Sequence, residues 1–257
     1  MCKTPLEIEI DSLMKSWAKF CHDQNQWEEA IFVEDGPFPF YEQQKTKILF
    51  IGRELYGKRN KGDPLTISYW NERECMEKLG VFQSRLLYLA YGIINGKYTE
   101  KDWIEMPNAK KLNDVLAIKE KRHGLKPFSY AFINASKILN TESKKTGEWF
   151  HEFITGDCKE KNLEFLLTEI SLLNPDIIVS GNLGYCHFFD YFKKPVLSNQ
   201  ENLDIDTSNC CIWSLKLKNK EIKWIDTWHF SAPKSNFDNF YNPVCKAAKI
   251  LLEKYVF

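Results

Sequence analysis

KILFIGRELYG (residues 47–57) indicates the fold class, because an apolar run, KILFIG (47–52), leads directly into a polar stretch. An uninterrupted apolar run of this length is typical of a strand that helices cover on both faces, as in a parallel sheet. Three more runs of this type follow along the chain, namely YAFIN (130–134), PDIIVSG (175–181) and IKWID (222–226). We therefore predict four core strands.

Segments in which apolar residues recur at helical spacing separate these runs. They occupy residues 6–27, 69–95, 108–121, 147–155, 159–173 and 240–255. Strands that alternate with helices predict an α/β fold, a three-layer α/β/α sandwich around a central, mostly parallel four-stranded sheet. The run CIWSLKLKN (211–219) alternates near its end and predicts a more exposed strand. No linker is visible, so we expect residues 1–257 to form a single α/β domain, with the N-terminal helical segment, about 1–45, packed on it.

The composition is that of a globular protein. The chain has 257 residues, of which 44% are hydrophobic and 27% charged. A chain of this length buries roughly three quarters of its unfolded surface, which excludes a disordered, collagen-like or cystine-framework protein. No apolar run reaches the roughly 18 residues that a membrane span needs, and the N-terminus has no apolar signal core. We therefore expect a cytoplasmic protein without a membrane partner.

The charge balance and the cysteine spacing limit which partners, metals and cofactors the sequence predicts. Lys and Arg number 35 and Asp and Glu also 35, so a generally basic nucleic-acid binder is disfavoured, whereas a local basic cleft is compatible with this balance. The eight cysteines form no C-x-x-C pair and match no zinc or iron–sulfur spacing. We expect reduced, packed thiols, no metal and no cofactor.

Polar and cationic side chains follow three of the four predicted strands. Parallel sheets bind their ligands beyond the carboxyl ends of the strands, so these side chains are the candidates for a site. Taken singly, each has a structural interpretation, such as a surface ion pair, a turn cap or a packed histidine. The candidates are Arg53, Glu54 and Lys58 after the first strand, Asn134, Ser136 and Lys137 after the second, and His229, Ser231 and Lys234 after the fourth.

Taken in chain order, the sequences at the ends of the predicted strands resemble the motifs of the uracil-DNA glycosylase superfamily. GRELYG (52–57) is similar to the motif G-Q-D-P-Y-H, and FINASK (132–137) is similar to the strand that ends in a base-reading Asn. LLNPDIIVSGN (172–182) looks like the segment that precedes the third motif, and HFSAPK (229–234) is similar to H-P-S-P-L-S. The resemblance covers about residues 45–250 and implies the fold of that superfamily.

The resemblance also implies a reaction, the hydrolysis of the bond between a sugar and a base such as uracil in DNA. Glu54 would position water and stabilise the cationic sugar, and His229 would stabilise the leaving base. Asn134 would read O4 and N3–H of uracil, with Gly52 and Tyr56 beside the base. The implied contacts to phosphate are Arg53, Lys58, Ser136, Lys137, Ser231 and Lys234.

Four departures from the motifs modify this expectation. Leu55 stands where the first motif has Pro, and Gly57 where it has His. Phe230 replaces the Pro after the histidine, and Pro233 stands where many members carry the Leu that wedges into duplex DNA. We therefore expect the protein to act on single-stranded DNA or an already flipped base. We also expect a monomer. A non-catalytic nucleobase or nucleic-acid binder of the same fold is the alternative, and an unrelated hydrolase that uses Cys186 beside His187 is a third hypothesis.

Overall fold

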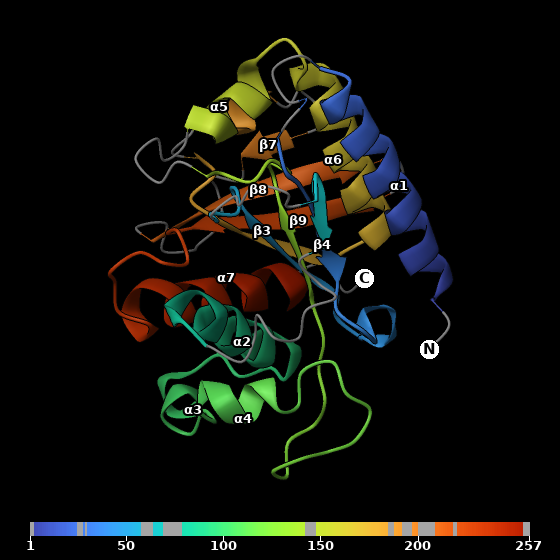
Figure 1. Cartoon of the computed structure of the whole chain (residues 1–257). Coiled ribbons are helices and arrows are strands. Elements are labelled where there is room, and N and C mark those ends of the chain that lie inside the picture. Colours follow the sequence, from blue (N-terminus) through green and yellow to red (C-terminus); the bar gives the residue numbers. More distant parts are fainter. Residues whose placement is uncertain are drawn as a thin grey trace.

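A seven-stranded mixed sheet, in the order β2-β5-β3-β6-β9-β8-β7, forms the centre of the structure (Figure 1). The structure is a computed structural model. It describes residues 3–24, 28, 30–57, 64–68, 79–141, 148–184, 188–191, 197–199, 209–217 and 220–253. Within these ranges, no helix is both long and apolar enough to span a membrane.

The four central strands correspond to the four apolar runs. They are β5 (Ala131–Asn134), β3 (Ile48–Gly52), β6 (Ile177–Gly181) and β9 (Lys220–Thr227), and each is parallel to its neighbour among the four. Helices connect them along the chain, so the predicted α/β class is confirmed. The parallel arrangement follows from runs that are apolar on both faces.

The sheet is larger than the predicted four strands because antiparallel strands extend both of its edges. β2 (Gly36–Pro37) pairs with β5 at one edge, whereas β8 (Cys210–Leu217) and β7 (Leu197–Asn199) extend the other edge beyond β9. β8 is the strand predicted over 211–219. β2 and β7 are too short to produce a periodic pattern. A separate two-stranded parallel sheet joins β1 (Phe32–Glu34) to β4 (Thr66–Ser68).

Alternate residues of β3 face opposite hydrophobic clusters, which places one helical layer on each side of the sheet (Figure 1). Leu49 and Ile51 pack in the first cluster, and Ile48 and Phe50 pack in the second. The first cluster includes residues of α1 (Pro5–His22), α5 (Glu148–Thr155) and α6 (Lys159–Leu173). The second includes residues of α2 (Val81–Ile94), α4 (Ala109–Asn113) and α7 (Asn242–Glu253).

Two predicted helices are shorter than their sequence pattern. The N-terminal helix ends at His22, and the rest of the segment to residue 45 contains β1, β2 and the 3-10 turn Tyr41–Gln43 rather than more helix. The helix predicted over 108–121 ends at Asn113. Beyond it the chain tightens into turns, and Ala117 has a left-handed φ of 55°, which an α-helix cannot accommodate. The part of the 69–95 prediction that covers residues 69–78 lies outside the described residues.

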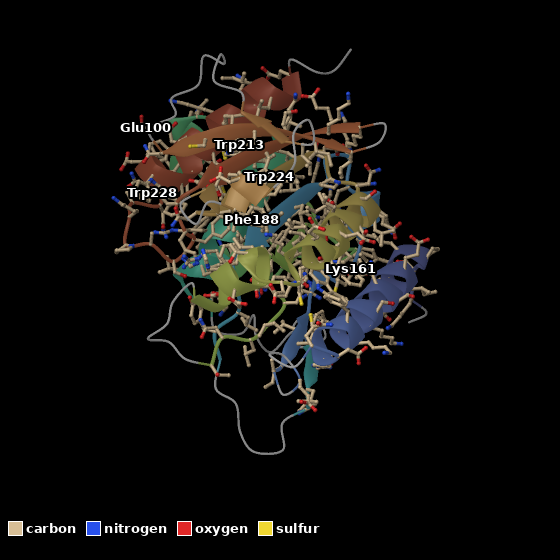
Figure 2. All side chains as sticks on the ribbon, turned by 90° about the horizontal axis from the view of Figure 1, so that it is seen from above. Glu100, Lys161, Phe188, Trp213, Trp224 and Trp228 are labelled. Atoms are coloured by element: carbon tan, nitrogen blue, oxygen red, sulfur yellow. The ribbon has the colours of Figure 1, made fainter. Side chains whose placement is uncertain are left out.

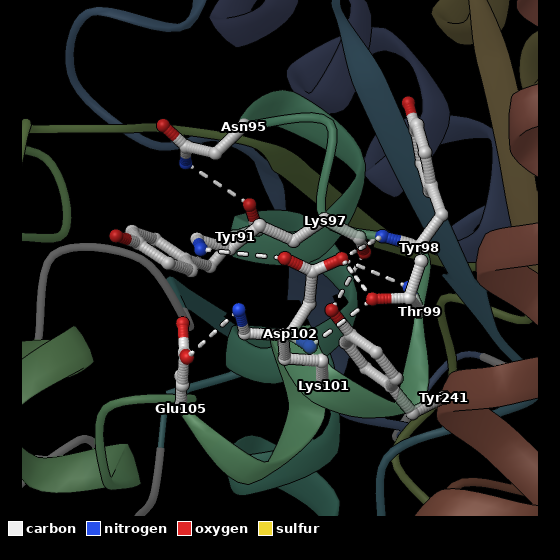
Figure 3. A network of polar contacts seen from close by, with 9 residues as sticks. All are labelled: Tyr91, Asn95, Lys97, Tyr98, Thr99, Lys101, Asp102, Glu105 and Tyr241. Carbon is white, nitrogen blue, oxygen red and sulfur yellow. Dashed lines mark hydrogen bonds and ion pairs between the residues drawn. The ribbon is translucent and has the colours of Figure 1, made fainter.

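A polar network joins the C-terminal end of α2 to the start of α3 (Glu100–Ile104) and to Tyr241, the residue that precedes α7 (Figure 3). Asp102 and Thr99 form a capping box at the start of α3. The Asp102 carboxylate also accepts from the Tyr98 N–H at 3.1 Å, and the Tyr241 hydroxyl donates to the Lys97 carbonyl at 2.7 Å. The position of α2 matters because this helix borders the candidate site described below.

We expect Gly92→Ala in α2 to reveal the contact between this helix and Tyr241. A Cβ at Gly92 would lie 2.7 Å from the Tyr241 ring, so the substitution should destabilise the protein by about 1–3 kcal/mol. In a Tyr241→Ala background the obstacle is gone, and the same change should stabilise the helix by roughly 0.5–1 kcal/mol. Urea unfolding of the four proteins measures both values. An equal effect in the two backgrounds would contradict this packing.

Candidate functional site

The four parallel strands all end on the same side of the sheet, which we call its carboxyl edge. The register pairs Gly52 of β3 with Asn134 of β5, and Gly181 of β6 with Thr227 of β9. The loops that follow these residues therefore leave the sheet side by side, about 4.8 Å apart from strand to strand. The groups predicted after the first, second and fourth strands thus begin at a common edge.

Asn134 lies directly over the backbone of Gly52. A Cβ at Gly52 would lie 2.8 Å from Asn134 Oδ1 and 2.9 Å from the Phe132 ring, so only glycine leaves room for both side chains. Asp35 accepts hydrogen bonds from the Asn134 backbone N–H at 2.6 Å and from Nδ2 at 3.1 Å. Because a carboxylate only accepts, this contact fixes which end of the amide is Nδ2. Oδ1 and the second N–H then carry the acceptor and donor that a base edge requires, on a residue that is 2% exposed.

Asp35 belongs to a fully buried charge cluster with Lys137 and Glu169. The Lys137 ammonium bonds to the Asp35 carboxylate and lies 2.8 Å from Glu169 Oε2 and 5.2 Å from the centroid of the Trp17 ring. Burial raises the pKa of Asp35, and it raises the pKa of Glu169 to about 8. The burial of both carboxyl groups therefore favours a cluster in which one lysine charge balances one carboxylate.

The structure corrects two of the predicted phosphate contacts. Lys137 is 0% exposed and its ammonium is bound inside the protein, so this side chain cannot reach a phosphate. Ser136 is also buried: its N–H donates to the Arg53 carbonyl at 2.8 Å, and its hydroxyl accepts from the Ile138 N–H at 3.4 Å. Sequence reasoning missed this burial because both residues follow a strand, as surface loop residues also do.

Glu54 is held between the first and second loops. Tyr56 donates its hydroxyl to Glu54 Oε1 at 2.6 Å, and Asn140 donates Nδ2 to the same oxygen at 3.3 Å. The two loops run together, with the Asn140 N–H donating to the Leu55 carbonyl at 2.8 Å. Glu54 is thus a buried carboxylate with a defined orientation, and Tyr56 is 38% exposed beside it.

His229 is a neutral imidazole with a defined tautomer. Its Nδ1 accepts from the Ser231 N–H at 3.3 Å, so the proton of the neutral ring resides on Nε2. Burial, and then the positive charges of Arg53 and Arg85, lower the pKa of His229 to about 4. Arg53, which follows β3, thus contributes to the electrostatic environment of His229.

Phe82, at the start of α2, is an aromatic neighbour of His229 that the sequence analysis did not identify. The Phe82 ring centroid lies 6.3 Å from that of His229 and meets Phe132 and Phe230 edge to face at 5.6 and 5.5 Å. The half-buried ring therefore bridges residues of β5 and of the loop after β9. An apolar ring next to hydrogen-bonding groups is what a flat heterocycle requires. Helical periodicity hid the residue, because it predicts only core packing there.

The cationic rim is smaller than predicted. Ser231 and Lys234 are exposed, and the Lys234 ammonium lies 4.5 Å from the centroid of the Trp228 ring. Trp228 is 36% exposed and lies at the periphery, whereas Trp224 and Phe188 lie inside the molecule (Figure 2). Exposed aromatic and cationic groups together suit a single nucleic-acid strand. Of the other predicted contacts, Arg53 is half-buried and Lys58 lies outside the described residues.

A buried carboxylate holds the loop after β6. Asp226 accepts from the Ser180 hydroxyl at 2.5 Å and from the backbone N–H groups of Leu183 at 3.0 Å and Gly184 at 2.9 Å. Burial raises its pKa to about 6, although these hydrogen bonds act in the opposite direction. Asp226 thus has a structural partner for each oxygen, and we assign it no chemical role. The next residues, which include Cys186 and His187 of the third hypothesis, lie outside the described part of the chain.

No protein-family model matches its sequence, and a search of curated proteins finds no match. In the described part of the chain, no three His, Cys, Asp or Glu side chains gather as a metal site requires. The geometry of the strand ends therefore carries the functional interpretation.

We expect Lys137→Met to destabilise the protein strongly, because it leaves two buried carboxyl groups without their cation. The cost should be about 3–5 kcal/mol in urea unfolding. Lys19→Met is the matched control, since Lys19 pairs with Asp23 at 2.7 Å but its side chain is 77% exposed. That change should cost less than about 0.5 kcal/mol. Equal stabilities, with weaker DNA binding only in Lys137→Met, would restore Lys137 as a phosphate contact.

Proposed function

We propose that the protein is a divergent member of the uracil-DNA glycosylase superfamily that removes uracil, or a related damaged base, from single-stranded or flipped DNA. One observation carries the proposal: Glu54, Asn134 and His229 each lie at, or two residues beyond, the carboxyl end of one of three parallel strands, in the chain order of the motif resemblance. The α/β class further supports it, as do the aromatic rings of Phe82, Phe132 and Phe230 near His229.

Each of the three groups has the chemistry that the reaction needs. A water molecule attacks C1′ of the sugar while the bond from C1′ to the base breaks, and the bonding electrons leave with the base. Glu54 orients the water, accepts its proton and stabilises the positive sugar. His229 donates its Nε2–H to the oxygen of the base on which negative charge develops. Asn134 pairs with N3–H and O4 of uracil, a pattern that cytosine lacks.

A neutral His229 suits this role better than a charged one. A neutral imidazole donates a hydrogen bond without requiring a counter-ion in a partly buried site. The hydrogen bond from Ser231 to Nδ1 keeps the proton on Nε2, where it is available as a donor. The low pKa of about 4 keeps the ring in this form throughout the physiological range.

One observation favours the alternative, a nucleobase or nucleic-acid binder without catalysis. Tyr56 and Asn140 both donate to Oε1 of Glu54, so this oxygen is engaged by the protein. A carboxylate held in this way could order the two loops without orienting a water molecule. The experiment below separates the two functions.

The test uses a labelled single-stranded oligonucleotide with one deoxyuridine, incubated with the protein and then treated with alkali. We expect strand cleavage at that position and none at deoxycytidine or thymidine. Glu54→Gln and His229→Gln should each lower the rate about 10²-fold or more, while fluorescence anisotropy shows that binding persists. Glu105→Gln, on an exposed turn, is the control and should keep the full rate.

No cleavage by the unmodified protein, combined with tighter binding of the deoxyuridine strand than of a thymidine strand, would replace the glycosylase by the binder. No cleavage and no preference would contradict both.

The pH dependence of the reaction provides a further prediction. Because the pKa of His229 is about 4, its protonated, inactive form accumulates only as the pH falls through that value. The rate should therefore change little between neutral pH and about pH 5, and its acidic limb should lie near 4 rather than near 6.5. Single-turnover rates measured across this range, with circular dichroism to confirm folding, test the prediction. A limb near 6.5 that disappears in His229→Gln would show that the imidazole is not held neutral.

A further inference from the structure

Arg85 of α2 binds the loop after β9 through four hydrogen bonds. Its Nε donates to Asn236 Oδ1 at 2.8 Å, and its Nη1 donates to the carbonyls of Phe230 at 2.7 Å and Ala232 at 2.8 Å. Its Nη2 donates to the Lys234 carbonyl at 2.7 Å. Three alternate carbonyls of one loop therefore point at a single guanidinium.

The position of Arg85 is unusual for a charged side chain. It is 3% exposed, and its guanidinium lies 3.9 Å from the centroid of the Phe240 ring. Burial of a charge is costly unless hydrogen bonds replace the lost water, and the carbonyl oxygens do this here. Removal of the guanidinium would leave three inward-facing carbonyls without this donor, so the loop would have to change its path.

The path of this loop decides the state of His229. The carbonyls of Phe230 and Ala232 lie on either side of Ser231, whose N–H donates to Nδ1 of His229. The Ala232 N–H also donates to the His229 carbonyl at 2.7 Å. The same guanidinium contributes to the low pKa of the imidazole. Arg85 thus acts on His229 through the backbone and through its charge.

We propose that Arg85 is a positioning residue of the candidate site, which fixes residues 230–234 so that the Ser231 N–H meets Nδ1 of His229 and the proton stays on Nε2. The consequence for catalysis rests on the proposed function, but the effect on the imidazole does not. Lysine cannot replace arginine here, because an ammonium lacks the planar fork that reaches several carbonyls at once.

The test compares the unmodified protein with Arg85→Lys and Asn236→Ala by NMR of the imidazole nitrogens over a pH titration. His229→Gln identifies the signals of His229 among the 5 histidines. Arg85→Lys keeps a positive charge but loses the fork, and Asn236→Ala removes one partner of the fork from an exposed position. Arg122→Lys makes the same chemical change at an exposed arginine and serves as the control.

We expect the unmodified protein and the control to show one tautomer, protonated at Nε2, with a pKa near 4. In Arg85→Lys both tautomers should appear, because the Ser231 N–H is no longer held against Nδ1. Asn236→Ala should show a smaller change in the same direction. On the deoxyuridine strand, Arg85→Lys should lower kcat about 10- to 100-fold with little change in KM.

His229 signals in folded Arg85→Lys that match the unmodified protein would overturn the proposal and reduce Arg85 to a structural residue. The NMR result needs no substrate, so it stands or fails independently of the glycosylase assay. Cleavage by the unmodified protein with an unchanged rate in Arg85→Lys would reject the positioning role and leave the proposed function intact.

Discussion

The sheet and the position of the candidate site both follow from the burial of β3 on its two faces. Ile48 and Phe50 pack on one side of the sheet and Leu49 and Ile51 on the other, so the strand has no position for a polar side chain. The same holds for most of β5 and β6. Polar groups can therefore appear only where these strands end, and the parallel arrangement brings those ends to one edge.

Buried charges then fix three of the four loops at this edge. Asp35 binds Asn134 at the end of β5, Asp226 binds the N–H groups after β6, and Arg85 binds the carbonyls after β9. The loop after β3 is held by backbone hydrogen bonds to its neighbour after β5. Burial of these charges costs free energy that apolar residues would not cost. These contacts define the backbone path of each loop, which a site made of loop residues requires.

The sequence predicted the four central strands because their apolar runs are continuous, but it missed β1, β2, β4 and β7, which are only two or three residues long. It placed α6 at its observed residues, and Asn174 and Pro175 account for the C-terminal end of this helix. Lys137 illustrates the limit. Its sequence position is that of a loop lysine, and its burial depends on Asp35 and Glu169, which lie far away in the chain. Arg85 is a second example, because no residue near it in the sequence predicts its carbonyl partners. The local apolar pattern of the sequence predicts where the central strands end. Contacts between residues far apart in the sequence determine which side chains are exposed at those ends.

A crystal structure of Glu54→Gln with a single-stranded oligonucleotide that contains deoxyuridine would show whether Asn134, Glu54 and His229 surround one nucleobase. We expect the uracil ring beside Phe82, with its N3–H and O4 paired to Asn134 and an oxygen within hydrogen-bond distance of His229 Nε2. A base bound elsewhere on the protein, with the edge formed by Gly52 and Asn134 left empty, would contradict this expectation.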